Sequence, residues 1–353
     1  MAGYFGRMES LGFEELIMVH DSPTGLKAVI AIHSTLRGPA LGGTRMWAYP
    51  SEEAAVEDVL RLARGMTFKA AAAELSLGGG KAVIMGDPGR DKSKALFQAY
   101  GRFVDRLQGR FLTAEDMGTC EQDLDWVRAE TAHVIGGSAC GSPSPYTAYG
   151  VWRGMKAAAA AAFGSASLSG LVVAVQGLGG VGSCLCRYLA EEGAALIVTD
   201  LDAARAAAAA KQWGARVVKA ADIYAQKCDI FAPCGVGAII NAETIPLLQC
   251  RIVAGAANNV LLEEADGVAL HHRGILYAPD YIINAGGLIF VDACRRGAAD
   301  SDQVYRDTGR IEGRLARLFH RAAGQGLTPE AAAALLVEEN MRKQANSEPE
   351  IAP

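Results

Sequence analysis

Two lysines stand among small and apolar residues rather than in a charged run, which makes them candidates for chemistry. Lys81 directly follows the triplet Gly78–Gly80, which is predicted to form a loop, and Lys69 lies at the end of a predicted helix, in GMTFKAAAA. Burial and a neighbouring cation both lower the pKa of a lysine, so one could be a general base near neutral pH while the other binds a substrate carboxylate. The alternative for each is a surface lysine with a buried stem.

Acidic, amide and thiol side chains follow several predicted strands. The segment TAEDMGT puts Glu115 and Asp116 just past a strand end, where active-site residues of α/β folds collect, although an aspartate there could also cap a helix. Later strands place further candidates at the carboxyl edge of a second sheet: Cys234, Asn258, Asn259 and Asn284. An amide side chain at this edge suits a nicotinamide carboxamide or a substrate amine. The adjacent Asn258 and Asn259 could equally form a turn.

The segment AVQGLGGVGS has the spacing of a dinucleotide-binding loop between a strand and a helix. Gly177 permits a tight turn, Gly179 lets a pyrophosphate approach the backbone, and Gly182 lets helix and strand pack closely. Asp200 ends the next strand, where it would bind a ribose 2′-hydroxyl and repel the extra phosphate of NADP. The segment therefore predicts an NAD site, with a turn that holds no ligand as the alternative. The predicted contacts are Gly177, Leu178, Gly179, Gly180, Val181, Gly182, Ser183 and Asp200.

The elements that position these residues alternate between strand and helix in the first third of the chain. Strands are predicted at residues 14–21, 27–34, 81–85 and 110–114, and helices at 51–69 and 92–107. Ser51 is the predicted cap of the first of these helices. The glycine-rich segment 38–45 is predicted to be a loop.

A segment rich in Gly, Ser and Pro, residues 136–145, predicts a loop and a domain boundary. After it, strands are predicted at residues 171–176, 195–200, 216–219, 230–232, 252–254 and 275–277. Helices are predicted at residues 147–163, 181–192, 203–213, 301–323 and 328–343, the last with Thr328 as its cap. The alternation is typical of a doubly wound α/β domain.

Length, charge and cysteine usage exclude several classes of protein. A chain of 353 residues is long enough for two domains. A net charge of −5 with scattered basic residues argues against binding to nucleic acid or to an anionic membrane. No signal peptide and no spanning apolar stretch is predicted. The eight cysteines include no Cys-x-x-Cys pair and the six histidines lack zinc-like spacing, so we expect no metal site and a cytoplasmic protein with reduced thiols.

Eight stretches of the chain carry the motifs of one enzyme family. They are LKAVIAIHSTLRGPALGGTRMW, DVLRLARGMTFKAAAAELSLGGGKAVI, GRFLTAEDMGT, PSPYTAYGVWRGMKAA, VVAVQGLGGVG, CDIFAPCGVGAIIN, VAGAANNVL and ILYAPDYIINAGGLI. They resemble the glutamate/leucine/phenylalanine/valine group of amino-acid dehydrogenases, above all its leucine-specific members. The resemblance implies the reversible NAD-dependent oxidative deamination of an L-amino acid to a 2-oxo acid and ammonia.

The resemblance also implies roles for individual residues. Lys69 would bind the substrate carboxylate, and Lys81 would be the catalytic lysine that activates water. Asp116 would transfer a proton at the amino group, which Asn259 would contact. Backbone close to the substrate would come from Gly42 and Gly43, and further contacts to the dinucleotide would come from Thr147, Cys234, Asn258 and Asn284.

The implied substrate pocket is apolar and leaves two substrate classes open. Its residues would be Leu41, Met66, Ala114, Leu288 and Val291, with no lysine or serine to bind a second carboxylate, so glutamate is not expected. Ala114 matches the leucine-specific members, whereas Leu288 is more similar to aromatic-specific ones. We expect a branched aliphatic substrate, with phenylalanine or another aromatic amino acid as the alternative and a non-catalytic NAD-binding regulatory protein as a distant third.

The implied architecture is α/β with two domains that flank a cleft. Residues 1–135 and a C-terminal helix at about 329–353 would form an α/β domain for substrate binding and oligomerisation. Residues 136–328 would form a Rossmann-type, doubly wound NAD-binding domain. The resemblance further implies a homo-oligomer, from dimer to octamer.

Overall fold

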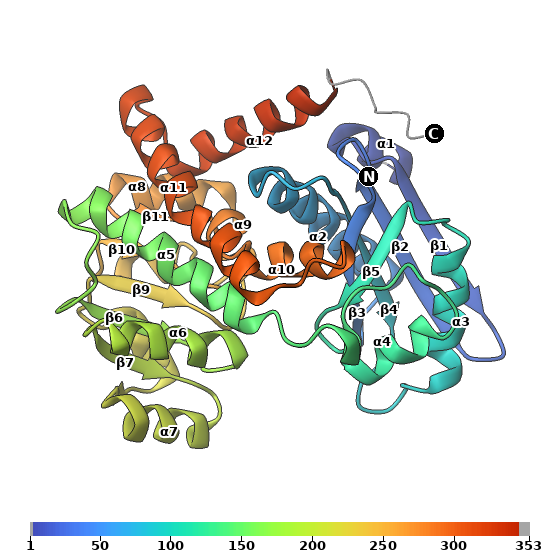
Figure 1. Ribbon diagram of the computed structural model, residues 1–353, viewed down its shortest axis with the longest axis horizontal. Helices are drawn as coiled ribbons and strands as arrows, with labels where there is room; N and C mark the ends of the chain where they lie inside the picture. Colours follow the sequence, from blue (N-terminus) through green and yellow to red (C-terminus); the bar gives the residue numbers. More distant parts are fainter. Residues whose placement is uncertain (1–2, 346–353) are drawn as a thin grey trace. The chain divides into compact units, whose positions relative to one another are not determined.

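The structure is a computed structural model that describes residues 3–345 and falls into two compact units. Unit 1 contains the chain up to Gly141, Val291–Ala298 and the chain from Val337, and unit 2 contains Ser142–Phe290 and Ala299–Leu336. Each unit has its own sheet, drawn in blue to teal for unit 1 and in green to orange for unit 2 (Figure 1). The end of the predicted C-terminal segment, residues 346–353, lies outside the described residues.

Unit 1 is built on a five-stranded sheet with the order β1-β2-β4-β3-β5. The strands are β1 (Glu15–Asp21), β2 (Leu26–Ser34), β3 (Ala40–Trp47), β4 (Gly78–Met85) and β5 (Phe111–Glu115). β2 pairs antiparallel with β1 and with β4, whereas β3 pairs parallel with β4 and with β5. The carboxyl ends of β3, β4 and β5 therefore meet at one edge of the sheet.

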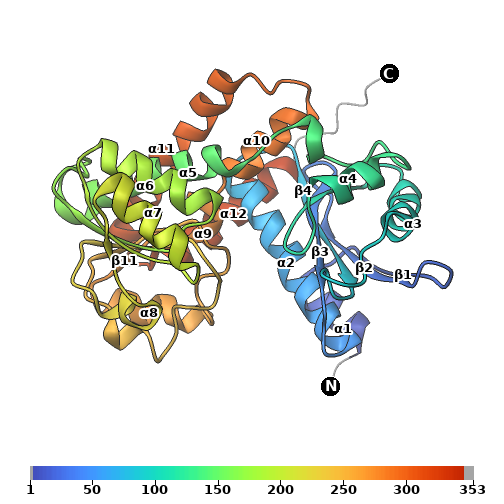
Figure 2. The ribbon, with the colours of Figure 1, turned by 90° about the horizontal axis from the view of Figure 1, so that it is seen from below.

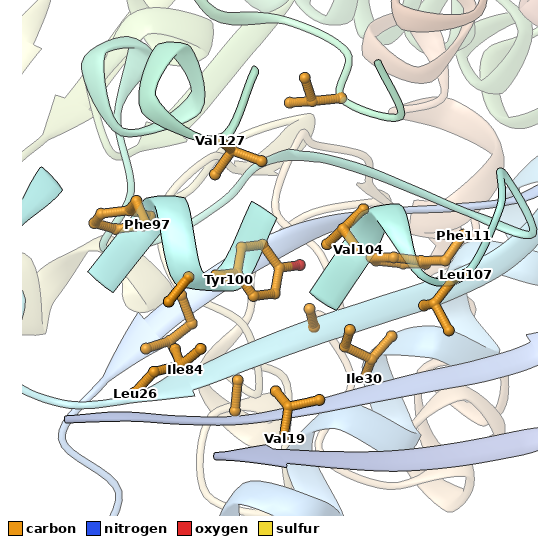
Figure 3. Close-up of a cluster of buried hydrophobic side chains, with 14 of the residues drawn as sticks. Val19, Leu26, Ile30, Ile84, Phe97, Tyr100, Val104, Leu107, Phe111 and Val127 are labelled. Carbon is orange, nitrogen blue, oxygen red and sulfur yellow. The ribbon is translucent and has the colours of Figure 1, made fainter. Parts of the chain in front are cut away.

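Both faces of this sheet are covered by helices. The α-helices up to residue 128 are α1 (Tyr4–Leu11), α2 (Glu52–Ala72), α3 (Lys94–Asp105) and α4 (Glu121–Arg128). Ala28 and Ile30 of β2 pack in the core under α3 and α4, while Val29 and Ala31 pack on the opposite face with α2, which lies along the sheet in Figure 2. Figure 3 shows Tyr100 of α3 inside the first of these cores. Alternate side chains of one strand thus serve two cores, as expected for a sheet between two layers.

Two glycine-rich segments that were predicted to be loops are strands, so those predictions are wrong. Residues 38–45 belong largely to β3, and Gly78–Gly80 opens β4. A Cβ atom at Gly42 would lie 1.8 Å from the carbonyl oxygen of Gly80, and one at Gly43 would lie 2.5 Å from that of Glu115. These glycines are present because the backbones of neighbouring strands approach closely, and not because the chain turns.

Unit 2 is built on a six-stranded parallel sheet with the order β11-β10-β9-β6-β7-β8, which confirms the doubly wound prediction. The strands are β6 (Val172–Gln176), β7 (Ala195–Thr199), β8 (Arg216–Val217), β9 (Ile230–Pro233), β10 (Ile252–Val253) and β11 (Leu276–Tyr277). The helices from residue 144 onward are α5 (Ser144–Phe163), α6 (Gly180–Glu191), α7 (Ala203–Trp213), α8 (Glu264–His272), α9 (Asp280–Ile283), α10 (Gly286–Arg295), α11 (Ser301–Gln325) and α12 (Pro329–Ala345).

The two predicted helix caps are present, whereas some short helices were not predicted from the sequence. Ser51 Oγ accepts a hydrogen bond from the backbone N–H of Ala54 at 3.1 Å, and Thr328 Oγ1 accepts one from that of Ala331 at 3.2 Å. The short helices α1 and α4 were not predicted, and α5 begins inside the predicted loop 136–145. Within residues 3–345, none of the helices combines the length and the apolar character that a membrane span requires.

Candidate active site

A lysine and an aspartate form a close ion pair at the sheet of unit 1. Lys81 lies on β4 opposite Ala31, and so points to the face that α2 covers. Its Nζ atom lies 3.0 Å from Oδ1 of Asp116, which follows β5. The Lys81 side chain is 6% exposed and that of Asp116 is 24% exposed. The structure thus brings together the two residues that the sequence analysis proposed as catalytic.

The surroundings shift the pKa of both members of this pair. Burial lowers the pKa of the Lys81 ammonium, and the Asp116 carboxylate offsets only part of that effect. Burial alone would raise the pKa of Asp116, but the positive charges of Lys81 and Arg45 outweigh it and hold that pKa below its ordinary value. The pair therefore combines a lysine that releases its proton more readily than a free one with a carboxylate that stays ionised.

The loop that carries Asp116 is fixed by hydrogen bonds of its own. The backbone N–H of Asp116 donates to Oγ1 of Thr119 at 3.0 Å, and the Thr119 hydroxyl lies 3.0 Å from the carbonyl oxygen of Thr44. Because Thr44 belongs to β3, these contacts tie the loop after β5 to the neighbouring strand. The hydrogen bonds therefore fix the backbone position from which the Asp116 side chain extends.

Arg45 and Asp58 are two charged residues of this site that sequence reasoning missed. Arg45 Nε lies 2.9 Å from Oδ2 of Asp116, and one of its terminal nitrogens lies 2.9 Å from Oδ2 of Asp58. A signal was present, since Asp58 directly precedes the apolar residues Val59 and Leu60, which are buried. The pairing itself joins β3 to α2 and depends on the tertiary structure.

The other predicted substrate residues are spread over both units. Lys69 is half-buried in the last turn of α2, and Met66 lies on the same helix. Leu41 on β3 is 1% exposed, and Ala114 lies near the end of β5. In unit 1 are Leu41, Gly42, Gly43, Met66, Lys69, Ala114 and Val291, and in unit 2 are Asn259 and Leu288.

In unit 2 the glycine loop has the geometry that a dinucleotide requires. Gly177 has a φ of +95°, in the left-handed region, and a Cβ at Gly182 would lie 2.0 Å from the Gly177 carbonyl oxygen. At Gly179, in contrast, no heavy atom of the described residues outside its chain neighbours lies within 4 Å of a Cβ position. Packing explains Gly177 and Gly182 but leaves Gly179 open to the approach of a ligand, so the residues fit the predicted cofactor.

Neighbouring groups hold this loop in place. Asp200 accepts hydrogen bonds from the backbone N–H groups of Leu178 at 2.6 Å and of Asp202 at 2.7 Å. The Ser183 hydroxyl donates to the Leu178 carbonyl oxygen at 2.8 Å, in the first turn of α6, which also contains Gly180, Val181 and Gly182. The loop and the first turn of α6 form one hydrogen-bonded structure, whose helix N-terminus favours a phosphate.

The remaining predicted cofactor residues lie in unit 2, Thr147 in the first turn of α5 and the others between helices and strands. Nδ2 of Asn284 donates to Oδ1 of Asn258 at 2.9 Å, and Asn259 has a φ of +49°, in the left-handed region, where the chain bends. Burial raises the pKa of the Cys234 thiol to about 12, which leaves it protonated at neutral pH. Thr147 donates from its hydroxyl to the carbonyl oxygen of Pro143 at 3.1 Å at the start of α5.

Unit 2 has the parallel sheet and the glycine loop of a dinucleotide-dependent oxidoreductase, and unit 1 carries the close ion pair of Lys81 and Asp116. Family models agree with this class. The model described as Glu/Leu/Phe/Val dehydrogenase, dimerisation domain, matches residues 14–133, and the model described as Glutamate/Leucine/Phenylalanine/Valine dehydrogenase matches residues 198–325. The chain belongs to the Glu/Leu/Phe/Val dehydrogenase family and is an amino-acid dehydrogenase.

Individual relatives extend this similarity over nearly the whole chain. The leucine dehydrogenase of Bacillus subtilis is 51% identical over 97% of this chain and 95% of its own. The L-tryptophan dehydrogenase of Nostoc punctiforme is 45% identical over 97% of both chains. The crystal structure of L-tryptophan dehydrogenase from that organism is similar with a TM-score of 0.84, at 43% identity over 96% of this chain and 99% of the other. The resemblance predicted from the motifs is therefore confirmed.

Proposed function

We propose that this enzyme catalyses the reversible NAD-dependent oxidative deamination of a branched-chain, leucine-like L-amino acid to the 2-oxo acid and ammonia. The observation that carries the proposal is the ion pair of the buried Lys81 with the half-buried Asp116 at 3.0 Å. The substrate class is supported by an identity of 51% to the leucine dehydrogenase of Bacillus subtilis over almost all of both chains. NAD is supported by Gly179 and by the carboxylate of Asp200 at the end of β7.

The chain's own groups would bind the substrate and move its protons. Lys69 binds the substrate carboxylate and Asn259 contacts the amino group, while Asp116 accepts a proton from that group. The bound dinucleotide supplies the chemistry of accepting the hydride from the substrate Cα. Lys81 takes a proton from the water as it adds to the iminium carbon, and Asp116 returns a proton to the nitrogen. The C–N bond then breaks and ammonia leaves, while the new hydroxyl loses its proton to solvent and becomes the carbonyl of the 2-oxo acid.

The pocket would select an apolar side chain. Its proposed lining residues are Leu41, Met66, Ala114, Leu288 and Val291, none of which could bind a second carboxylate. Gly42 and Gly43 present backbone to the substrate. An aromatic substrate is the second candidate, favoured by Leu288 and by the 45% identity to an L-tryptophan dehydrogenase.

The dinucleotide would be bound by unit 2. Its contacts are the segment from Gly177 to Ser183, Asp200 for the ribose hydroxyls, and four further residues: Thr147, Cys234, Asn258 and Asn284. We assign residues 1–135 with the C-terminal helix to substrate binding and oligomerisation, and residues 136–328 to NAD binding. A homo-oligomer in the cytoplasm, from dimer to octamer, completes the proposal, which includes neither a metal nor a nucleic-acid partner.

The direct test is NADH formation at alkaline pH with L-leucine, L-valine, L-isoleucine, L-phenylalanine and L-tryptophan in parallel. We expect the highest kcat/KM with a branched aliphatic substrate. Turnover of none of the five would refute the proposed reaction. A higher kcat/KM with phenylalanine or tryptophan would keep the reaction and overturn the substrate preference.

A further inference from the structure

Four charged side chains of alternating sign form a continuous row in unit 1. Lys81 Nζ lies 3.0 Å from Oδ1 of Asp116, whose Oδ2 lies 2.9 Å from Nε of Arg45. A terminal nitrogen of the same guanidinium lies 2.9 Å from Oδ2 of Asp58. The row runs from β4 through the loop after β5 and β3 to α2, and it gives each carboxylate oxygen of Asp116 its own cation.

The end of this row at α2 is fixed by the Tyr49 hydroxyl, which donates to Oδ2 of Asp58 at 2.7 Å. Arg61 meets the other oxygen, with a terminal nitrogen 3.0 Å from Oδ1 of Asp58. The side chains of Arg45 and Asp58 are 17% and 16% exposed, whereas that of Arg61 is 56% exposed. A guanidinium is planar and rigid, so one that is held at Asp58 presents its Nε to Asp116 from a fixed direction.

We propose that Arg45 is a positioning residue of this enzyme, which acts through Asp116. Held by Asp58, it binds Oδ2 of Asp116 and so turns Oδ1 toward Lys81. Without Arg45 the carboxylate could rotate about its side-chain bonds and exchange its two oxygens. The inference rests on the proposed function, because it assumes the proton-transfer roles of Asp116 and Lys81.

The charges in the row give the inference a signature that a structural role would not produce. The positive charge of Arg45 lowers the pKa values of Lys81 and Asp116, and the negative charge of Asp58 raises the pKa of Lys81. In the proposed mechanism Lys81 and Asp116 both accept protons, so their deprotonation sets the acidic limb of the kcat/KM profile. Loss of Arg45 moves this limb to higher pH, and loss of Asp58 moves it to lower pH.

The experiment compares Arg45→Met with Arg61→Met in the full-length enzyme. Both variants remove an arginine from Asp58, but Arg61 does not contact Asp116 in the structure and serves as the matched control. We expect R45M to lower kcat with the branched-chain substrate by about 10- to 100-fold, as for other small displacements of a proton-transfer group, and to shift the acidic limb to higher pH. R61M should leave kcat and the limb near those of the wild type, and NAD affinity should be unchanged in both.

Two more variants complete the test. Arg45→Lys keeps the positive charge but loses the planar set of N–H donors of the guanidinium. The acidic limb of R45K should therefore lie at the wild-type pH, while its kcat stays below that of the wild type. Asp58→Asn should lower kcat and shift the limb to lower pH. Thermal melting identifies any variant that does not fold, and if R45M is one of them, kcat of R45K and D58N decides, since wild-type values in both would overturn the positioning role.

The outcomes separate this inference from the proposed function. An R45M enzyme with wild-type kcat and pH profile would overturn the positioning role and leave the proposed function intact. Equal changes in R45M and R61M, or shifts of the same sign in R45M and D58N, would also overturn it. A wild-type enzyme that turns over none of the amino acids would refute the proposed function, and the role of Arg45 with it.

Discussion

The close approach of β3 and β4 makes Gly42→Ala a severe test of the fold around Lys81. The new Cβ would lie 1.8 Å from the Gly80 carbonyl oxygen, 2.5 Å from its carbon and 3.0 Å from the Lys81 nitrogen. Ordinary contact begins at 3.4 Å, so the strands would have to separate locally by about 1.6 Å, the difference between 3.4 and 1.8 Å. Both obstructing groups are backbone, so no side-chain rotation can relieve the overlap.

The expected magnitude follows from that displacement. Overpacking of a well-packed core costs about 1–3 kcal/mol and occasionally more, and a backbone overlap of this size lies at the upper end. We therefore expect G42A to lower the free energy of unfolding by about 3 kcal/mol or more. Because the displaced atoms include the backbone nitrogen of Lys81, the side chain that carries the reacting Nζ would shift with it, and kcat should fall by about 100-fold in whatever fraction folds.

Gly65→Ala is the matched control in the same unit. Gly65 lies inside α2, and a Cβ there has no heavy atom within 4 Å outside its own helix and chain neighbours among the described residues. Alanine in place of glycine within a helix should stabilise by up to about 1 kcal/mol. Urea unfolding and NADH formation measure both variants. A G42A enzyme with the stability and kcat of the wild type would refute the packing argument, and so would equal destabilisation by G65A.

Three further predictions concern the two proposed ligand sites and one buried acid. Lys81→Ala should abolish turnover while NAD binding, followed by calorimetry, stays intact; unchanged turnover would remove Lys81 from its role. Asp200→Ala should weaken binding of NAD more than of NADP, and equal losses would contradict the ribose contact. Both carboxylate oxygens of Glu330 are buried, and burial raises its pKa from 4.5 to about 7. Because the charged form is disfavoured in the folded state, the contribution of Glu330 to stability should fall as pH rises from 4.5 to about 7, by about 3 kcal/mol. Glu330→Gln should remove this loss, and melting curves of the two proteins that run parallel across that range would contradict it.

Unit 2 could be predicted from the sequence in outline because its signals are local. The apolar run of β6, the glycine loop and Asp200 lie within about 30 residues of one another and have one structural solution. Ser51 and Thr328 were identified as caps for the same reason, since a cap depends on the residues of its own first turn.

Unit 1 was predicted less well because its glycines are required by contacts with residues that are distant in the sequence. Gly42 and Gly43 suggest a loop when only adjacent residues are considered. Their lack of a side chain is required by the carbonyl groups of Gly80 and Glu115, which belong to strands that come later in the chain. Local propensity could not distinguish the two causes.

For the candidate site, the sequence by itself determined the chemical groups: two lysines in apolar surroundings, an aspartate past a strand end, and a glycine loop followed by an acid. It also determined the family, since the family motifs are long runs of consecutive residues that can be recognised without a structure. Only the tertiary structure decided that Lys81 meets Asp116, and that Arg45 and Asp58 continue the row of charges. The physical reason is that ion pairing and desolvation depend on distances across β3, β4, the loop after β5 and α2, which no local pattern of residues encodes.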